Sequence, residues 1–140
     1  MIARKEMWDI GEDFAHSTGH GVGFCLNVHE GPFSISLKNT HPIYSNMIFS
    51  NEPGLYKNGK YGIRIENLVY TKEIKLNKKK FLILDMLTQA PYERDLIDKT
   101  RLNIEEKKWL NNYHKSVIKN ITPYLNKLEK LWLENQCRKI

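Results

Sequence analysis

Glycine is confined to the first half of this sequence, and that distribution limits the folds that the chain can adopt. All eight glycines lie at or before Gly62, where glycine and proline separate short β-like segments. After Pro91, residues that favour helices dominate. Because strands separated by turns come first and helices follow, the sequence predicts a fold of the α+β class.

The first part of the chain should form short strands joined by turns. Residues 2–9 are typical of the last turns of a helix that ends at Gly11, and because its start is missing we expect a fragment of a longer protein. Asn58-Gly59 favours a turn over residues 57–60, which would join its two neighbouring strands into an antiparallel pair. The expected strands are 24–28, 47–53, 62–74 and 81–86.

Two helices should follow from about residue 103. Asn103 can cap the first helix, with Glu106 as its capping-box partner. Pro123 should end that helix and occupy the first position of the next one, which Thr122 would cap. We expect two apolar stripes to form the core: Trp109, Leu110, Tyr113, Val117, Ile118 and Ile121 in the first helix, and Leu125, Leu128, Leu131 and Trp132 in the second.

Composition and charge argue against several classes of protein. The longest apolar run, residues 81–87, contains Asp85 and is far shorter than the roughly 20 residues of a spanning helix, so no membrane partner is expected. No secretory signal is apparent, and two distant cysteines indicate a reduced, cytoplasmic setting. The formal charge of +6 comes from scattered lysines without interleaved aromatic residues, which does not favour a nucleic-acid partner.

Four polar, glycine-containing motifs hold the candidates for chemistry. An imidazole together with two strand-borne carboxylates suits Mn, Fe, Co or Zn. The residues alone leave an alternative open, because Arg64 shares a strand face with Glu66 and could form a purely structural ion pair with it. The motifs are His16–Gly23 (HSTGHGVG), His29–Pro32 (HEGP), Asn51–Tyr56 (NEPGLY) and Gly62–Asn67 (GIRIEN).

In their order and approximate spacing, the four motifs resemble those of the Xaa-Pro aminopeptidases (aminopeptidase P) among the pita-bread metallopeptidases. The VHEGP form is more similar to the long, eukaryote-like branch than to prolidase. The segments LTQAP (87–91) and WLNNYH (109–114) extend the resemblance towards the end of the chain. The resemblance implies the C-terminal half of a pita-bread catalytic domain in residues 1–79 and the mostly helical extension of aminopeptidase P in residues 80–140.

The resemblance also implies an activity and a set of metal ligands. Such an enzyme is a proline-specific metalloaminopeptidase, which cleaves the bond between an N-terminal residue and a following proline. Its site holds two divalent ions, with Mn²⁺ as the expected metal, that activate a bridging hydroxide. By motif position, His20 and Glu52 would be metal ligands, and Glu66 would bridge both ions.

Further roles follow from the same motif positions. His29 would hydrogen-bond the substrate and steady the tetrahedral intermediate. His16 would line the substrate pocket or help to move protons. Arg64 would orient the ligands, and Tyr56 would assist it.

The sequence departs from the family pattern in its aspartates. The family site needs two aspartates from an earlier strand pair, and Asp9 and Asp13 have neither the sequence context nor the position for that role. Three of the five expected ligands are therefore present. This chain alone should hold at most one ion, weakly.

The missing ligands leave three interpretations open. In the first, a separate chain carries the N-terminal half and completes a split enzyme that acts on peptides with proline second. In the second, the chain is a catalytically inert remnant. In the third it is a binding module on the pita-bread scaffold, although the intact His20, Glu52 and Glu66 argue against such repurposing. A homo-oligomer is compatible with each.

Overall fold

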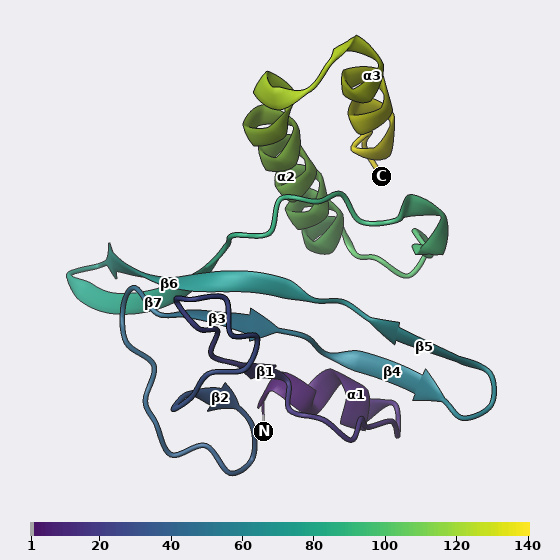
Figure 1. Ribbon diagram of the computed structural model, residues 1–140. Helices are drawn as coiled ribbons and strands as arrows, with labels where there is room; N and C mark the ends of the chain where they lie inside the picture. The colour runs from purple at the N-terminus through teal and green to yellow at the C-terminus, as the bar shows by residue number, and fades with distance from the viewer. Residues whose placement is uncertain (1) are drawn as a thin grey trace. The chain divides into compact units, whose positions relative to one another are not determined.

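The computed structural model describes residues 2–140 and divides into two compact units. The first unit runs to Thr88 and contains all the strands of the described residues (Figure 1). The second unit, Gln89–Ile140, contains the two longest helices. Among residues 2–140, no helix combines the length and the apolar character needed to cross a membrane.

A short helix precedes the first polar motif, as the sequence predicted. A 3₁₀ turn, η1 (Ile2–Arg4), leads into α1 (Lys5–Asp9), and the chain leaves the helix at Gly11 with φ of +73°. Arg4 lies across the ring of Phe14 and donates hydrogen bonds to the Phe14 carbonyl and to Asp13. These contacts connect the helix to the segment that enters the motif.

A long antiparallel hairpin forms the centre of the first unit, and the predicted pairing of residues 47–53 with 62–74 is confirmed. Its turn closes through a hydrogen bond from the Lys60 amide to the Lys57 carbonyl, with Gly59 at φ of +68°. Figure 1 shows β3 and β4 in line, with β5 and β6 beside them. The strands are β3 (Ile48–Asn51), β4 (Gly54–Lys57), β5 (Tyr61–Arg64) and β6 (Asn67–Leu76).

A further strand extends the sheet on the other side of β6. β7 (Lys79–Met86) pairs antiparallel with β6, which confirms the strand predicted over 81–86. Asn77 and Lys78 both have positive φ, as a two-residue hairpin turn requires. The strand order is β3-β6-β7, and the core of this unit consists of Phe33, Phe49 and Val69 with Ile35, Met47 and Met86 packed against them.

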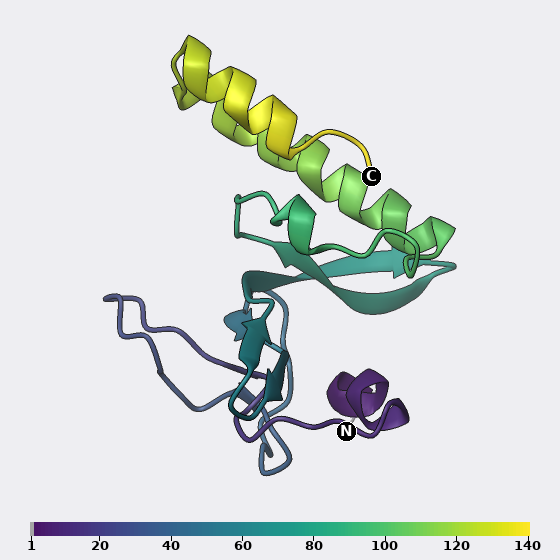
Figure 2. The same cartoon turned by 90° about the vertical axis from the view of Figure 1, so that its right-hand side faces the viewer.

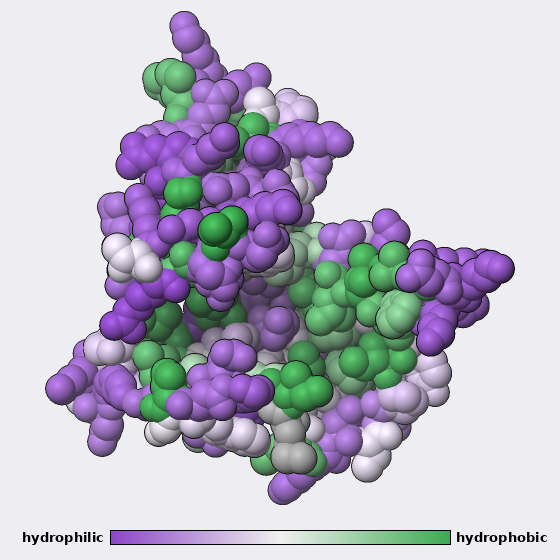
Figure 3. Space-filling model, turned by 180° about the vertical axis from the view of Figure 1, so that it is seen from behind, coloured by the Kyte–Doolittle hydropathy of each residue, from purple (hydrophilic) through white to green (hydrophobic). Residues whose placement is uncertain are grey.

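The outer strand of this sheet carries apolar side chains that the described residues leave exposed. Phe81, Leu82, Ile83 and Leu84 are consecutive in β7, and each is more than a third exposed. Figure 3 shows hydrophobic surface in broad patches on this side of the molecule. Alternate side chains of a strand point to opposite faces, so both faces of β7 expose apolar surface.

Two very short strands bring the histidine motifs to the hairpin. β1 (Gly19–His20) pairs with β2 (Ser34–Ile35), and Gly21 bridges to Phe49 of β3. The strand predicted over 24–28 is wrong. Those residues form a turn in which the Gly23 amide bonds the Asn27 carbonyl, and with no neighbouring strand to pair with, Phe24 is almost fully exposed.

The second unit is helical, as predicted. Asn103 caps the long helix α2, and Glu106 returns the bond to the Asn103 amide, so the predicted capping box is confirmed. α3 returns beside α2 (Figures 1 and 2), and the Ile140 amide bonds Asn111 of α2. The elements are η2 (Arg94–Leu96), α2 (Ile104–Ile121), η3 (Thr122–Tyr124) and α3 (Lys127–Gln136).

Two expectations for these helices are wrong. Thr122 begins the 3₁₀ turn η3 with Pro123, and α3 starts later, where Asn126 accepts bonds from the Leu128 and Glu129 amides. The second apolar stripe is also not core. The side chains of Leu128, Leu131 and Trp132 are exposed, whereas Leu133 and Cys137 are buried. The spacing of apolar residues identified a helix here but not the face that packs.

Candidate metal centre

The register of the central hairpin places Glu52 opposite Glu66. β3 and β6 pair as far as Asn51↔Asn67, and β4 and β5 resume the pairing at Gly54↔Arg64 in the same register. The two glutamates occupy the interruption between these pairs, next to Pro53, whose carbonyl accepts from the Ile65 amide at 3.1 Å. Like charges directly opposite each other destabilise a sheet, so this arrangement calls for a cation.

β1 brings His20 to the same place. The His20 amide donates to the Ser50 hydroxyl at 3.0 Å, and the Glu52 amide donates to the Thr18 carbonyl at 2.7 Å. A Cβ atom at Gly19 would lie 2.0 Å from the Ser50 carbonyl oxygen, so only glycine permits this close approach of the two backbones. The position of the imidazole therefore depends on the residue beside it.

His20, Glu52 and Glu66 converge, as we expected, with one potential ligand atom from each lying within 4.8 Å of the others. His20 Nε2 and Glu52 Oε1 are 3.1 Å apart. Two ligands held at right angles about 2.1 Å from one ion would lie about 3 Å apart, so this spacing fits a shared divalent ion. Glu52 is buried, His20 is half-buried and Glu66 is exposed.

The hydrogen bond on the other side of the imidazole determines which nitrogen can bind an ion. His20 Nδ1 lies 2.8 Å from the Gly21 carbonyl, which can only accept, so Nδ1 carries the hydrogen. In the neutral ring the Nε2 lone pair then faces the carboxylates. Three groups that all present lone pairs fit a divalent cation, and the carbonyl contact is typical of histidines that bind metals.

Charged and hydroxyl donors hold the Glu52 carboxylate. Arg64 Nη1 donates to Glu52 Oε2 at 2.9 Å, and the Ser50 hydroxyl donates to Oε1 at 3.1 Å. Of the alternatives that the sequence left open, the structural ion pair of Arg64 forms with Glu52 rather than with Glu66, which acts on Arg64 only through its charge. Glu66 lies in the break between β5 and β6 and is exposed, rather than buried within a continuous strand.

A hydrogen-bonded chain leads from Arg64 to His16. Arg64 Nε donates to the Tyr56 hydroxyl at 2.9 Å, and this bond is the main reason that the pKa of Arg64 is raised above its usual value. The Tyr56 hydroxyl lies 2.8 Å from His16 Nε2, and His16 Nδ1 contacts the Ser17 carbonyl. All three of His16, Tyr56 and Arg64 line a cavity of about 470 Å³ that Asp13, Phe14 and Ala15 complete.

His29 reaches the site from an exposed loop. Its ring centroid lies 4.1 Å from that of His20, and the loop between them closes through the bond from the Glu30 amide to the Gly21 carbonyl. Asn27 donates to the His29 carbonyl at 3.1 Å. The predicted site residues are thus gathered around two clusters, one at His20 and one at His16, joined by Arg64.

No aspartate of the described residues belongs to the group formed by His20, Glu52 and Glu66. Asp13 bonds Arg4, and its pKa is lowered chiefly by a hydrogen bond from Trp8 and then by one from the Phe14 amide. Asp9 pairs with Lys5 on α1. The sequence-based expectation missed Ser50. Because side chains two apart in a strand share a face, its position two residues before Glu52 was an available signal.

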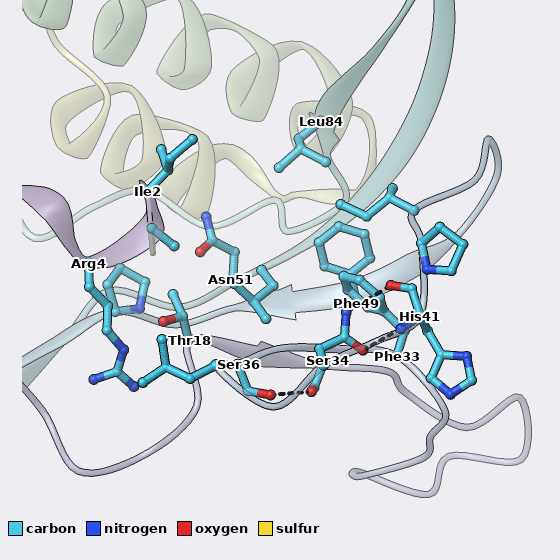
Figure 4. A pocket seen from close by; sticks show the side chains of 17 residues that line it. Ile2, Arg4, Thr18, Phe33, Ser34, Ser36, His41, Phe49, Asn51 and Leu84 are labelled. Carbon is cyan, nitrogen blue, oxygen red and sulfur yellow. Dashed lines mark hydrogen bonds between the residues drawn. The ribbon is translucent and has the colours of Figure 1, made fainter.

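A second cavity of the first unit lies elsewhere. This groove has a volume of about 690 Å³ and is lined by β2, the loop that follows it and β3. Figure 4 shows Thr18, Ser34 and Ser36 along one side and Leu84 on the other. Among the described residues, its lining includes none of His16, His20, His29, Glu52, Arg64 or Glu66.

A mixed helix and sheet fold with an imidazole and two opposed carboxylates at a strand break defines a candidate metal-binding protein. Comparison with known families identifies it further. The model of metallopeptidase family M24 matches residues 1–73, and that of the C-terminal region of peptidase_M24 matches residues 80–140. The chain belongs to the metallopeptidase family M24.

Individual relatives agree with this assignment. The chain is 42% identical to a probable Xaa-Pro aminopeptidase P of Coprinopsis cinerea over 99% of its length, and 40% identical to Xaa-Pro aminopeptidase 1 of Dictyostelium discoideum over 98%. It spans 24% and 23% of these relatives, respectively.

A solved structure confirms the fold. The crystal structure of X-prolyl aminopeptidase from Caenorhabditis elegans, described as a cytosolic enzyme with a di-nuclear active site, superimposes with a TM-score of 0.88 at 40% identity. The match covers 98% of this chain and 23% of that protein. The predicted α+β, pita-bread type of fold is therefore confirmed.

Proposed function

We propose that this chain contributes the C-terminal part of the catalytic unit of a metal-dependent aminopeptidase that removes the N-terminal residue before proline. The convergence of His20, Glu52 and Glu66 is the observation that carries the proposal. The relatives named Xaa-Pro aminopeptidases support the substrate class. The description of the Caenorhabditis elegans enzyme supports two metal ions and a cytoplasmic location.

The three converging residues would hold the metal. His20 would bind through Nε2 and Glu52 through Oε1, and Glu66, which lies opposite Glu52 in the hairpin, would be the carboxylate shared with a second ion. The metal, for which Mn²⁺ is our proposal, supplies Lewis-acid activation of water and of the peptide carbonyl. Two aspartates from polypeptide outside these 140 residues complete the ligands, so this chain alone holds at most one ion weakly.

The remaining candidates act on the substrate and the ligands. His29, whose ring lies beside that of His20 in an exposed loop, donates to the substrate carbonyl as negative charge develops there. His16 lines the cavity next to Tyr56 and holds or moves a proton at Nε2. Arg64 keeps Glu52 in place through its bond to Oε2. We propose a division of the sequence at residues 1–79 and 80–140, which the two family matches support, although β7 pairs with β6 in the first compact unit.

Complementation tests this function. The 140-residue chain would be mixed with a polypeptide carrying the remaining catalytic portion of the Dictyostelium discoideum relative, supplied with Mn²⁺, and assayed on an Xaa-Pro peptide. We expect hydrolysis by the mixture and none by either part alone. A peptide with alanine in place of the proline should be cleaved far more slowly. Absence of hydrolysis by the mixture under any divalent metal would identify an inert remnant instead.

A further inference from the structure

The hydroxyl of Ser50 lies between two of the candidate metal ligands. Ser50 is 1% exposed and sits in β3, two residues before Glu52. Its Oγ accepts from the His20 amide at 3.0 Å and lies 3.1 Å from Glu52 Oε1. One buried hydroxyl thus touches the backbone of one ligand and the side chain of the other.

The hydrogen-bonding capacity of a hydroxyl determines which way its hydrogen points. Ser50 has one hydrogen to donate, and two acceptors are within reach, Glu52 Oε1 at 3.1 Å and the His20 carbonyl at 3.4 Å. The carboxylate is closer and charged, so it is the stronger acceptor. The hydroxyl hydrogen is therefore directed at Glu52, while a lone pair of Oγ accepts from the His20 amide.

This bond restricts the carboxylate at the atom that faces the imidazole. Glu52 Oε1 is the same oxygen that lies 3.1 Å from His20 Nε2, while Arg64 holds the other oxygen, Oε2. With both oxygens held, the carboxylate cannot rotate about its last bond without losing a hydrogen bond. A lone pair of Oε1 is then kept aimed at the position between Glu52 and His20.

We propose that Ser50 is a positioning residue of the metal centre, whose hydroxyl sets the distance and direction between His20 and Glu52. The inference rests on the proposed function, because it assumes that these residues bind metal. It differs from a purely structural role, in which Ser50 would only help β1 to pair with β3.

Thr71 offers a matched control for the structural role. It is fully buried in β6 of the same sheet, and its Oγ1 accepts from the Met47 amide at 2.8 Å and donates to the Tyr44 carbonyl. Its hydroxyl therefore links backbone segments as that of Ser50 does. Its recorded partners are in the loop before β3, away from His20, Glu52 and Glu66.

The experiment compares Ser50→Ala, Ser50→Thr and Thr71→Val in the full 140-residue chain by titration with Mn²⁺. We expect Ser50→Ala to weaken Mn²⁺ binding by about 10- to 100-fold, as loss of groups that orient metal ligands does. Ser50→Thr keeps the hydroxyl and should recover most of the affinity. Thr71→Val should lower the melting temperature of the metal-free chain and leave the Mn²⁺ affinity unchanged.

A metal-free measurement provides an independent readout. In Ser50→Ala the His20 amide loses its acceptor, so its hydrogen exchange should accelerate relative to the wild type without any metal present. If Ser50→Ala does not fold, Ser50→Cys keeps the side-chain size with a weak donor and should show the same loss of Mn²⁺ affinity.

The outcomes separate this inference from the proposed function. Wild-type affinity in a folded Ser50→Ala chain, or an equal loss in Thr71→Val, would overturn the role of Ser50 and leave the metal centre intact. Failure of the wild-type chain to bind any Mn²⁺ would overturn metal binding by this chain alone and, with it, the role of Ser50, whereas the proposed function is decided separately by the complementation assay.

Discussion

The two units of this chain bury polar side chains in different settings. In the strand unit, Ser50 and Glu52 are buried next to a site that opens to solvent at Glu66. In the helical unit, Arg94 donates to the carbonyls of residues 138 and 139, and His114 accepts from the Tyr92 amide. Polar burial in the first unit holds side chains of the candidate metal centre in place, whereas in the second it ties the end of the chain to the helices.

Among the substitutions considered, replacement of Glu66, the carboxylate opposite Glu52, should have the largest effect on Mn²⁺ affinity. We expect Glu66→Gln to weaken Mn²⁺ binding by more than about 100-fold, beyond the range for groups that merely touch a ligand. Removing one of two opposed charges should also stabilise the metal-free chain slightly, by roughly 0.2–1 kcal/mol. Titration calorimetry with Mn²⁺ and thermal unfolding measure the two effects.

Glu73→Gln is the control for this variant. Glu73 lies in β6 and pairs with Lys80 at 3.0 Å on the surface. Its replacement should leave Mn²⁺ affinity unchanged. Equal losses in the two variants would mean that binding reflects general negative charge.

A core substitution in the helical unit should change the stability of that unit and leave Mn²⁺ affinity unchanged. Leu133 of α3 is 2% exposed, so Leu133→Ala should lower the free energy of unfolding of this unit by about 2–5 kcal/mol. Leu128→Ala, at a position that is 78% exposed, should change it by less than about 0.5 kcal/mol. Denaturant unfolding monitored by circular dichroism distinguishes them, and similar effects at both positions would show that the wrong face of α3 has been assigned to the core.

The smallest expected effect is a decrease in the unfolding free energy of the helical unit at acidic pH. Burial, with a smaller contribution from Arg94, lowers the pKa of His114 below its ordinary value of 6.5. The unfolded chain therefore takes up a proton that the folded chain does not, and stability falls as the pH drops below about 6.5. The loss should be at most about 1.4 kcal/mol per pH unit.

His114→Gln tests this effect because glutamine can accept from the Tyr92 amide but does not titrate in this range. The difference in unfolding free energy between the wild type and this variant should shift with pH between 7 and 5. His41→Gln, at an exposed position in the strand unit, is the control. A difference that is independent of pH would contradict the burial effect.

Local signals explain what could be predicted from the sequence. The capping box of Asn103 and Glu106 needs only residues three apart, and the turn at Asn58-Gly59 needs only two neighbours. The register of the site was not accessible in the same way. Counting back from a two-residue turn over 57–60 would place Glu52 opposite Ile65, whereas the observed pairing of Lys57 with Tyr61 adds one residue to the turn and places Glu52 opposite Glu66.

Features that depend on tertiary contacts could not be predicted in this way. The role of Ser50 requires β1 to lie against β3, which depends on the absence of a side chain at Gly19. The apolar residues of α3 have helical spacing on more than one face of the helix. The spacing therefore could not distinguish buried Leu133 from exposed Leu128. α3 starts later than predicted, at Lys127 after its Asn126 cap, because the 3₁₀ turn over Thr122–Tyr124 intervenes, and the capping pattern did not reveal that turn.

Direct observation of the ion tests the central claim most sharply. Crystals of the chain soaked with Mn²⁺ would be measured at the manganese absorption edge to locate the metal by anomalous scattering. We predict a peak about 2.0–2.3 Å from His20 Nε2 and from a carboxylate oxygen of Glu52, with Glu66 within reach of the same ion. A well-ordered manganese peak elsewhere, with no density among these three side chains, would contradict the account.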